Sequence, residues 1–368
     1  MLFSLALCAC QSAKYYSQAI NGQSHILLDR QPISEIMTDP ETPVPLLNRL
    51  MFILKVREFA KNELQLPVNK HYLTYVDLKR PFVVWNVFST PEFSLAPKTW
   101  CYPIVGCTAY RGYFSEENAH QYADALKNQG YDVYVGGVTA YSTLGWFDDP
   151  VLSTFIRLSE ARIAALIFHE LAHQILYVAD DTAFNESFAT AVEQEGLRKW
   201  QNASRDSQLY SDYLYDYSRR RLFIRLIMKY RRKLEFLYQT DLAPSDKREK
   251  KASIFAELRN EYERIKARQI DLAVYDGWMN EPLNNARIIS VAMYHDFVPA
   301  FQKMIAAQAG NLNRFYLACK NLAQKKKEER HQILNTYVEK QESGSFQSAL
   351  PRLPALAESG AAVFNLDR

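Results

Sequence analysis

The segment His169-Glu170-Leu171-Ala172-His173 decides the architecture of this 368-residue chain, together with Asn185-Glu186-Ser187-Phe188-Ala189 that follows it. Residues four apart in an α-helix project from one face, so the imidazoles of His169 and His173 can bind a single metal ion. Glu170 is displaced around the helix by one residue, which suits it to act as a general base on water near the metal. The spacing predicts a helix with two metal ligands and a base.

The surroundings of this segment are apolar nearly all round from Ile163 to Leu176, as expected of a helix buried inside a domain. Two histidines and a glutamate without partners in such an interior would cost on the order of several kcal/mol. A bound metal ion would satisfy them, so the composition around the motif supports a metal site.

A third ligand comes from the next segment, where Asp181 or Thr182 can cap a new helix that carries Glu186 in its first turns. Two antiparallel helices joined by a short turn would place Glu186 opposite the histidines. Two histidines and one glutamate with an open fourth position compose a catalytic zinc site, whereas structural sites are usually closed and rich in cysteine. We expect one Zn²⁺ ion, with Thr190 orienting a ligand from one turn further along.

The two motifs resemble those of the gluzincin metallopeptidases, the superfamily of thermolysin and the neutral zinc aminopeptidases, in which HExxH is followed by Asn-Glu-x-x-Ala. Leu176 stands where metzincins have a glycine, and no third histidine follows closely, so the metzincin pattern fits poorly. The resemblance implies that His169, His173 and Glu186 are metal ligands and that Glu170 is the base.

A closer resemblance covers nearly the whole chain and is carried by five strings: Val84–Phe88, Pro91–Leu95, Gly106–Phe114, Tyr141–Pro150 and Leu283–Arg287. These strings resemble a family of bacterial lipoproteins described as aminopeptidases. The resemblance implies a zinc peptidase of the bacterial envelope that acts on peptides.

The expected reaction is hydrolysis of a peptide bond by metal-activated water, with Glu170 passing the proton to the leaving amine. An aminopeptidase also needs an acidic pocket for the substrate ammonium, and Asp148, Asp149 and Glu193 are unranked candidates. The alternatives are a zinc endopeptidase and a non-catalytic envelope protein that binds peptides or assists assembly.

Other substrate contacts are expected on both sides of the zinc motif. Tyr294 is the first candidate to stabilise the oxyanion, with Arg287 and His295 as alternatives, and Arg287 is also a candidate substrate-binding residue. The stretch containing Gly137, Ala140 and Tyr141 is placed to pair with the substrate backbone as an edge strand, although an ordinary hairpin turn is equally compatible.

The N-terminus resembles the end of a bacterial lipoprotein signal peptide, because Leu7, Ala9 and Cys10 match the lipobox after a short apolar run. Cys10 would be lipidated and would anchor the protein in the bilayer, on the periplasmic side and most simply at the outer membrane. No Lys or Arg precedes the run, so a buried N-terminal helix is the alternative. No other stretch approaches the roughly 18 apolar residues of a membrane span.

Two further cysteines, Cys101 and Cys107, bracket a short loop that contains a proline and a glycine. In an oxidising periplasm they could form a disulfide, and two free thiols are the alternative.

Composition and periodicity set the fold class. The formal charge is +3, and basic residues alternate with acidic ones along helical segments, so nucleic acid is not an expected partner. Residues 33–66 are expected to be helical, residues 72–148 to hold short strands around a helix over 115–129, and residues 208–240 and 246–274 to form a helical hairpin.

The predicted fold is therefore α+β and predominantly helical, with gluzincin-like active-site helices next to a small mixed β-sheet and a long charged helical hairpin. The predicted divisions are a signal remnant over 1–10, an α+β catalytic region over 11–200, a helical region completing the cleft over 201–336 and a flexible tail over 337–368.

Overall fold

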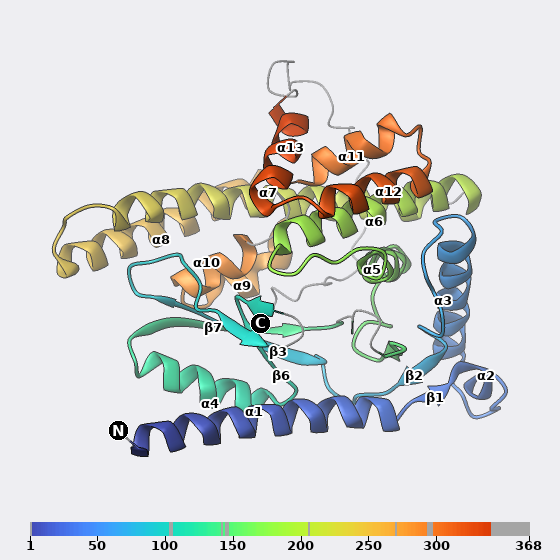
Figure 1. Cartoon of the computed structure of the whole chain (residues 1–368), viewed down its shortest axis with the longest axis horizontal. Coiled ribbons are helices and arrows are strands. Elements are labelled where there is room, and N and C mark those ends of the chain that lie inside the picture. The colour runs from blue at the N-terminus through green and yellow to red at the C-terminus, as the bar shows by residue number, and fades with distance from the viewer. Residues whose placement is uncertain are drawn as a thin grey trace.

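The computed structural model of the chain describes residues 2–102, 106–140, 143, 147–204, 207–268, 271–292 and 297–339 (Figure 1). Helices dominate, and the strands form small sheets of two or three members, which confirms a predominantly helical α+β fold. Among the described residues, no helix is long and apolar enough to cross a membrane.

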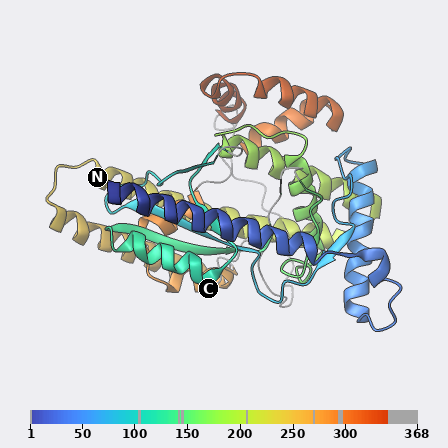
Figure 2. The same cartoon turned by 60° about the horizontal axis from the view of Figure 1, so that its bottom comes forward.

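The N-terminal helix α1 (Leu2–Leu28) runs beside helix α4 (Glu116–Lys127) below the central sheet, as Figure 2 shows from another side. Side chains of α1 are described from Tyr15 onward, so the lipidation predicted at Cys10 lies outside them. Helix α4 begins after Ser115, whose side chain caps it by accepting a hydrogen bond from the Asn118 backbone nitrogen, which confirms the helix predicted over 115–129.

The helical structure predicted over residues 33–66 is confirmed in part, because the structure has two helices there with a turn between them. These are α2 (Ile33–Ile36) and α3 (Val44–Asn62), separated by a turn that contains Pro40. Pro43 is the N-cap of α3, a position where a proline at the start of a helix leaves no internal hydrogen bond unmade.

The central sheet has the order β6-β3-β7 and is antiparallel throughout, with β3 (Val84–Pro91) between β6 (Arg111–Tyr113) and β7 (Tyr131–Val138). A second sheet is mixed, with the order β1-β2-β8, and a separate hairpin pairs two short strands. Strand β7 is therefore an edge strand. The remaining strands are β1 (Gln31–Pro32), β2 (Thr74–Val76), β8 (Val151–Leu152), β4 (Trp100–Tyr102) and β5 (Gly106–Thr108).

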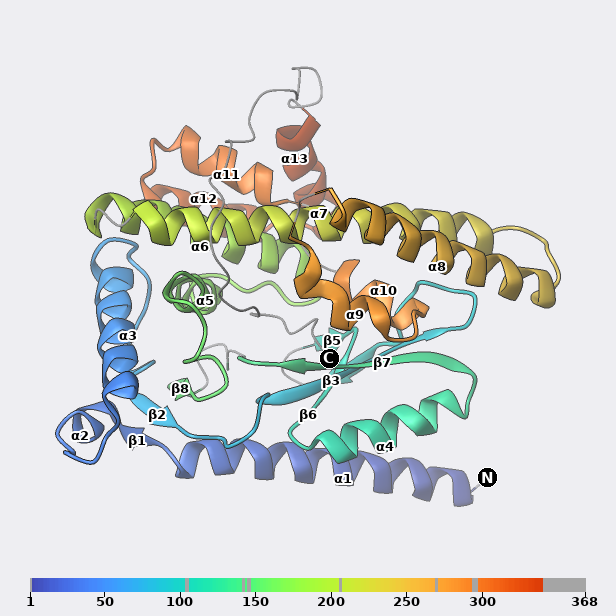
Figure 3. The same ribbon diagram turned by 180° about the vertical axis from the view of Figure 1, so that it is seen from behind.

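Helices α5 (Glu160–His173) and α6 (Thr182–Ser204) pack against each other above the sheet, as seen from behind in Figure 3. The turn between them is held by Asn185, whose side-chain oxygen accepts from the backbone nitrogen of Val178 and whose amide donates to the oxygen of Val178, both at 2.8 Å. Asp181 caps α6 by accepting from the Phe184 nitrogen at 3.3 Å, as one of the two predicted caps.

A long helical hairpin follows, formed by α7 (Ser207–Tyr238) and α8 (Pro244–Lys266), with the turn close to its predicted place. The second helix ends at Lys266, earlier than the predicted residue 274, and the chain continues through η1 (Ala273–Tyr275), α9 (Asp276–Asn280) and α10 (Asn285–Ala292). Ion pairs tie α7 to α8, including Lys229 with Glu261 at 2.6 Å. The charges predicted along this hairpin are thus partly paired with each other.

Three C-terminal helices cover the outer side of α6: α11 (Val298–Ala307), α12 (Leu312–Ala323) and α13 (Lys327–Glu339) (Figure 1). Buried aromatic rings join them to α6, as between Phe188 and Phe315, whose centroids are 5.7 Å apart. Helix α13 extends to Glu339, three residues into the predicted tail, and the rest of that prediction lies outside the described residues.

The buried side chains form three clusters. The largest surrounds α5 and α6, the second lies between the central sheet and the α7–α10 layer, and the third lies between the sheet and α4. The predicted zinc motif therefore sits in the largest core, where packing from several elements fixes the positions of its side chains.

Candidate metal centre

Three predicted ligands come together between α5 and α6. The Nε2 atoms of His169 and His173 are 3.2 Å apart, and Glu186 Oε2 lies 3.3 Å from His169 Nε2. The other carboxylate oxygen of Glu186 lies 3.7 Å from His173 Nε2. The histidines are four positions apart on one helix face, and Glu186 faces them from the first turns of α6, as the sequence predicts.

These separations suit a tetrahedral metal ion. Two ligand atoms bound to one zinc ion at 2.0–2.2 Å with tetrahedral angles lie about 3.3–3.6 Å apart. The separations of 3.2 and 3.3 Å around His169 Nε2 are close to that range. Nitrogen and carboxylate donors are also the ligand types that zinc takes in sites with an open position. The donor set therefore fits zinc in both chemistry and spacing.

The Nδ1 side of the His169 ring contacts Glu193, which the sequence suggests as a candidate for binding the substrate ammonium. His169 Nδ1 donates to Glu193 Oε2 at 3.0 Å, and the Tyr213 hydroxyl donates to Glu193 Oε1 at 2.9 Å. Because the carboxylate only accepts, this bond places the proton of the neutral imidazole on Nδ1, so that Nε2 is the nitrogen that would bind a metal ion. Glu193 lies two helical turns after Glu186, and that spacing could have revealed its position.

The electrostatics favour positive charge at the centre of the set. Burial lowers the pKa of His169, but hydrogen bonds to Glu186 and Glu193 outweigh it and raise that pKa to about 10. Burial lowers the pKa of His173 to about 4. The charge of Glu186 raises this pKa, and the charge of His169 lowers it further. One histidine thus holds a proton between the carboxylates where a cation would bind.

Glu170 lies beside the ligands and lines a cavity together with Tyr72 and Ala140. Burial raises the pKa of its carboxyl to about 7; His169 lowers that pKa, while Glu186 and other nearby carboxylates raise it. A carboxylate with a pKa near neutral can both accept and return a proton, which is the property required of a general base.

Two of the three acidic candidates for the ammonium lie on the same cavity. Asp148 and Asp149 both line it with Glu170, whereas Glu193 is engaged by His169 and Tyr213. The buried Asp149 carboxylate accepts from the Thr143 hydroxyl at 2.7 Å. Asp148 and Asp149 thus line this cavity and Glu193 does not, and which acid would contact the ammonium stays a prediction.

The predicted substrate strand leads to the same place. Ala140 lines the cavity with Glu170, Gly137 belongs to β7, and Tyr141 lies outside the described residues. A Cβ at Gly137 would approach the Phe82 ring to 2.3 Å, so packing against Phe82 requires glycine there. The Phe82 side chain that Gly137 approaches lies just before strand β3.

The remaining predicted residues are placed less directly. Arg287 is 4% exposed and contacts the second core cluster, with its guanidinium carbon 4.8 Å from the Tyr134 ring centroid. Thr190 is buried on α6, one turn after Glu186, and its orienting role stays a prediction. Tyr294 and His295 lie outside the described residues, so their roles stay predictions too.

Tyr110 and Tyr72, which the sequence motifs do not predict as site residues, lie near the site. Burial raises the pKa of Tyr110, and the Glu186 and Glu170 charges raise it further. Burial also raises the pKa of Tyr72, with further effects of Glu170 and Asp149. Tyr110 stands inside the quoted string 106–114, which was the available signal.

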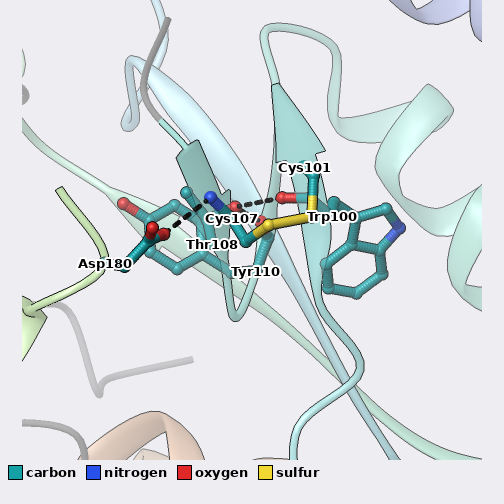
Figure 4. Close-up of a disulfide and its surroundings, with 6 residues drawn as sticks. All are labelled: Trp100, Cys101, Cys107, Thr108, Tyr110 and Asp180. Carbon is teal, nitrogen blue, oxygen red and sulfur yellow. Dashed lines mark hydrogen bonds between the residues drawn. A yellow bond between two sulfur atoms is a disulfide. The ribbon is translucent and has the colours of Figure 1, made fainter. Parts of the chain in front are cut away.

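Cys101 and Cys107 form a disulfide that bridges β4 and β5 directly across their pairing (Figure 4). The Cys107 backbone nitrogen donates to Asp180 Oδ1 at 3.1 Å, in the turn that joins the two ligand helices. The preceding Gly106 has a φ of +75°, and a Cβ there would lie 2.8 Å from the same carboxylate oxygen. The disulfide hairpin thus docks against the turn beside the candidate metal centre.

No curated protein and no solved structure matches the chain. A family model described as "Putative aminopeptidase" matches residues 14–334, which include the three predicted metal ligands, Glu170 and the disulfide. The matched range spans most of the chain and supports peptidase function. The chain belongs to this aminopeptidase family.

Proposed function

We propose that the protein is a zinc-dependent aminopeptidase of the gluzincin type, anchored in the bacterial envelope. The observation that carries the proposal is the convergence of His169, His173 and Glu186, at separations that suit one tetrahedral ion, beside Glu170. A structural metal site would not need Glu170 next to the ligands, so its presence favours an enzyme over a non-catalytic peptide-binding protein.

His169, His173 and Glu186 would hold the zinc ion, and Glu193 would keep the ring of His169 in the ligating orientation. Bound zinc would supply Lewis acidity, polarising the scissile carbonyl and making water a better nucleophile. Glu170 then accepts the proton of the attacking water and delivers it to the leaving amine, so that one carboxylate serves as base and then as acid. Tyr294 remains the first candidate to stabilise the oxyanion, and Tyr110 joins it.

Substrate binding would combine the edge of β7 with the acidic end of the cavity. A peptide that adds to β7 would gain main-chain hydrogen bonds, and Ala140, two residues after the end of this strand, shares a cavity with Glu170. Asp148 and Asp149 lie on that cavity and would attract the free ammonium of the first substrate residue.

The location at the envelope is supported by two features of the chain. Cys10 completes a lipobox, and acylation there would tether the protein to the bilayer on the periplasmic side. The Cys101–Cys107 disulfide is of the kind that persists in an oxidising compartment. Mass spectrometry of Cys10 in protein purified from membranes tests the anchor: an unmodified thiol there would contradict it.

The enzymatic proposal is tested by Glu170→Gln. This variant should keep the zinc content of the wild type while hydrolysis of a peptide with a free N-terminus falls by about a hundredfold to ten-thousandfold, because the proton acceptor is lost. Glu160→Gln, in the first turn of the same helix, is the matched control and should retain activity. Full turnover in the Glu170 variant would refute the general-base role.

The requirement for a free N-terminus on the substrate distinguishes an aminopeptidase from an endopeptidase. If the ammonium is recognised, acetylation of the peptide should abolish cleavage of the first bond, and product analysis should show release of single residues. Cleavage of acetylated peptides at internal bonds would indicate the endopeptidase alternative. Zinc binding without cleavage of any peptide would indicate the non-catalytic alternative.

A further inference from the structure

We infer that the protein rests on the lipid bilayer through the outer face of helix α1, in addition to its acyl anchor. The inference rests on the proposed anchoring in the envelope and adds the surface of the folded chain that contacts the lipid. It follows from the near absence of charge on α1, from the place of α1 in the fold and from the exposure of its apolar side chains.

Helix α1 has almost no charged side chains, although it lies along the outside of the molecule, below α4 and the central sheet (Figures 1 and 2). Lys14 is the one Lys, Arg, Asp or Glu among its 27 residues, whereas 12 of the 23 residues of α8 are of these types. A surface helix that faces water normally carries charged residues on its outer side, as α8 does. The outer side of α1 is therefore unusual for a helix in contact with water alone.

The inner face of α1 is fixed by contacts with the rest of the protein. Ile26 is buried in the largest core cluster, and Gln18 Oε1 accepts from the backbone nitrogen of Phe114 at 3.0 Å. A Cβ at Gly22 would lie 2.2 Å from the Phe114 ring, so this turn of the helix packs closely against the segment that follows β6. These contacts determine which side chains of α1 point outward.

Three apolar side chains of α1 point outward at helical spacing. Tyr16, Ile20 and Leu28 are 43%, 66% and 81% exposed. Ile20 and Leu28 lie four and twelve positions after Tyr16, so that all three share one stripe along the helix with Ser24 between them. If this stripe enters the boundary between headgroups and acyl chains, its apolar side chains leave water and no charged group of the stripe has to be desolvated.

Two observations favour a bilayer over a second protein as the partner of this stripe. The helix from Tyr15 to Leu28 is about 20 Å long and about 10 Å wide, so it offers a face of only a few hundred Å², roughly, against the ~800 Å² per partner of a standard protein interface. Cys10, the predicted acylation site, lies on the same helix, six positions before Tyr16. Acylation there would hold the stripe at the membrane surface at a high effective concentration.

The first test places a nitroxide spin label at Ile20→Cys in the acylated protein, bound to vesicles of phosphatidylethanolamine and phosphatidylcholine. We expect oxygen, which concentrates in lipid, to reach this label, and a water-soluble nickel chelate to reach it several-fold less than the same label at Leu317→Cys. Leu317 is the matched control because it is 61% exposed on α12.

Equal access of the nickel chelate to both positions would overturn the inference. Spin–spin broadening between labels at position 20 would show that a second copy of the chain covers the stripe, and this result would overturn the inference as well.

The second test measures how the unacylated full chain, with Cys10→Ser, partitions onto the same vesicles. Replacing Ile20 and Leu28 together with serine should lower the partition coefficient by about tenfold or more, because two aliphatic side chains no longer enter the lipid. The control replaces Phe236 and Leu317, which are similarly exposed on α7 and α12, and should leave the coefficient unchanged. Thermal unfolding checks that both double variants fold. Equal partition coefficients for the two would contradict the role of α1.

Salt separates apolar contact from the attraction of charges. Raising the sodium chloride concentration should not weaken the partition onto these zwitterionic vesicles, because the stripe carries no charge that salt could screen. Binding that requires anionic lipid and is lost in salt would assign the contact to a charged surface instead and overturn the inference.

The outcomes distinguish this inference from the proposals on which it builds. An unmodified Cys10 would refute the acyl anchor, and the partition of the unacylated chain would still decide whether α1 contacts lipid. Acylated Cys10 with a water-exposed label at position 20 would overturn only the inference. Peptide hydrolysis enters neither test, so its absence would refute the proposed peptidase activity alone.

Discussion

The two sides of the candidate site differ in how far apart in the chain their partners lie. On the α5–α6 side, the hydrogen bond between His169 and Glu193 joins residues 24 positions apart. On the strand side, Cys107 reaches Asp180 across 73 positions and Asn284 reaches Val133 across 151. The metal-binding half is a local helical hairpin, and the substrate-facing half is assembled from distant segments. We therefore expect variants on the helical side to affect the chemistry and those on the strand side to affect substrate choice.

The largest effect should come from the helical side. Glu186→Gln replaces a carboxylate ligand with a neutral amide, so zinc content should drop well below one per chain and hydrolysis should be lost with it. Elemental analysis and a peptide assay on the same sample measure both. Glu195→Gln on the same helix is the control, since the Glu195 carboxylate pairs with Arg198 instead. Stoichiometric zinc in the Glu186 variant would break the assignment of the ligands.

A smaller effect is expected from Glu193, which contacts the predicted ligand His169. Glu193→Gln keeps an acceptor for His169 Nδ1 but removes its charge, so zinc affinity should fall by about tenfold. Titration against a competing chelator measures the affinity. Excess zinc should restore activity to this variant, which separates support of a ligand from direct catalysis; activity that stays low at saturating zinc would contradict that role.

The smallest effect should come from the strand side. Replacing Cys101 and Cys107 together with serine should lower the free energy of unfolding by about 2 kcal/mol, because the closed loop is short. Thermal unfolding measures it. We expect KM to rise several-fold with kcat largely kept, since the hairpin touches the turn through Asp180 and holds no metal ligand. A loss of kcat as large as that of Glu193→Gln would erase the contrast between the two sides.

The same contrast explains what could be predicted from the sequence. The positions of His169, His173 and Glu186 follow from helical spacing and one capped turn, so they could be derived before the structure. The partner of Glu193 could not be derived, because helical phase alone does not tell whether its carboxylate contacts His169 or a substrate ammonium. The hydrogen bond from Asn284 to Val133 could not be derived, since the partner of Asn284 on β7 is fixed only by the tertiary fold.

The errors in secondary structure have local causes. The helix expected over residues 33–66 is interrupted after Ile36, in a stretch where Pro40 and Pro43 outweigh the apolar periodicity on either side. The second arm of the charged hairpin ends at Lys266, although apolar residues continue, because the chain turns into η1 and buries Leu272 and Tyr275 in the second cluster. In both cases the apolar periodicity correctly indicated that side chains are buried, but it did not indicate where each helix ends.

The turn between the ligand helices carries anchors in opposite directions. Asp180 accepts from the disulfide hairpin, while the next residue, Asp181, forms a buried ion pair with Arg330 of α13 at 2.6 Å. Asn185 closes the turn on itself through Val178. An insertion here would disturb all three contacts at once. A redesign that lengthens this connection would therefore have to restore the contacts to the hairpin and to α13 to keep the two helices in register.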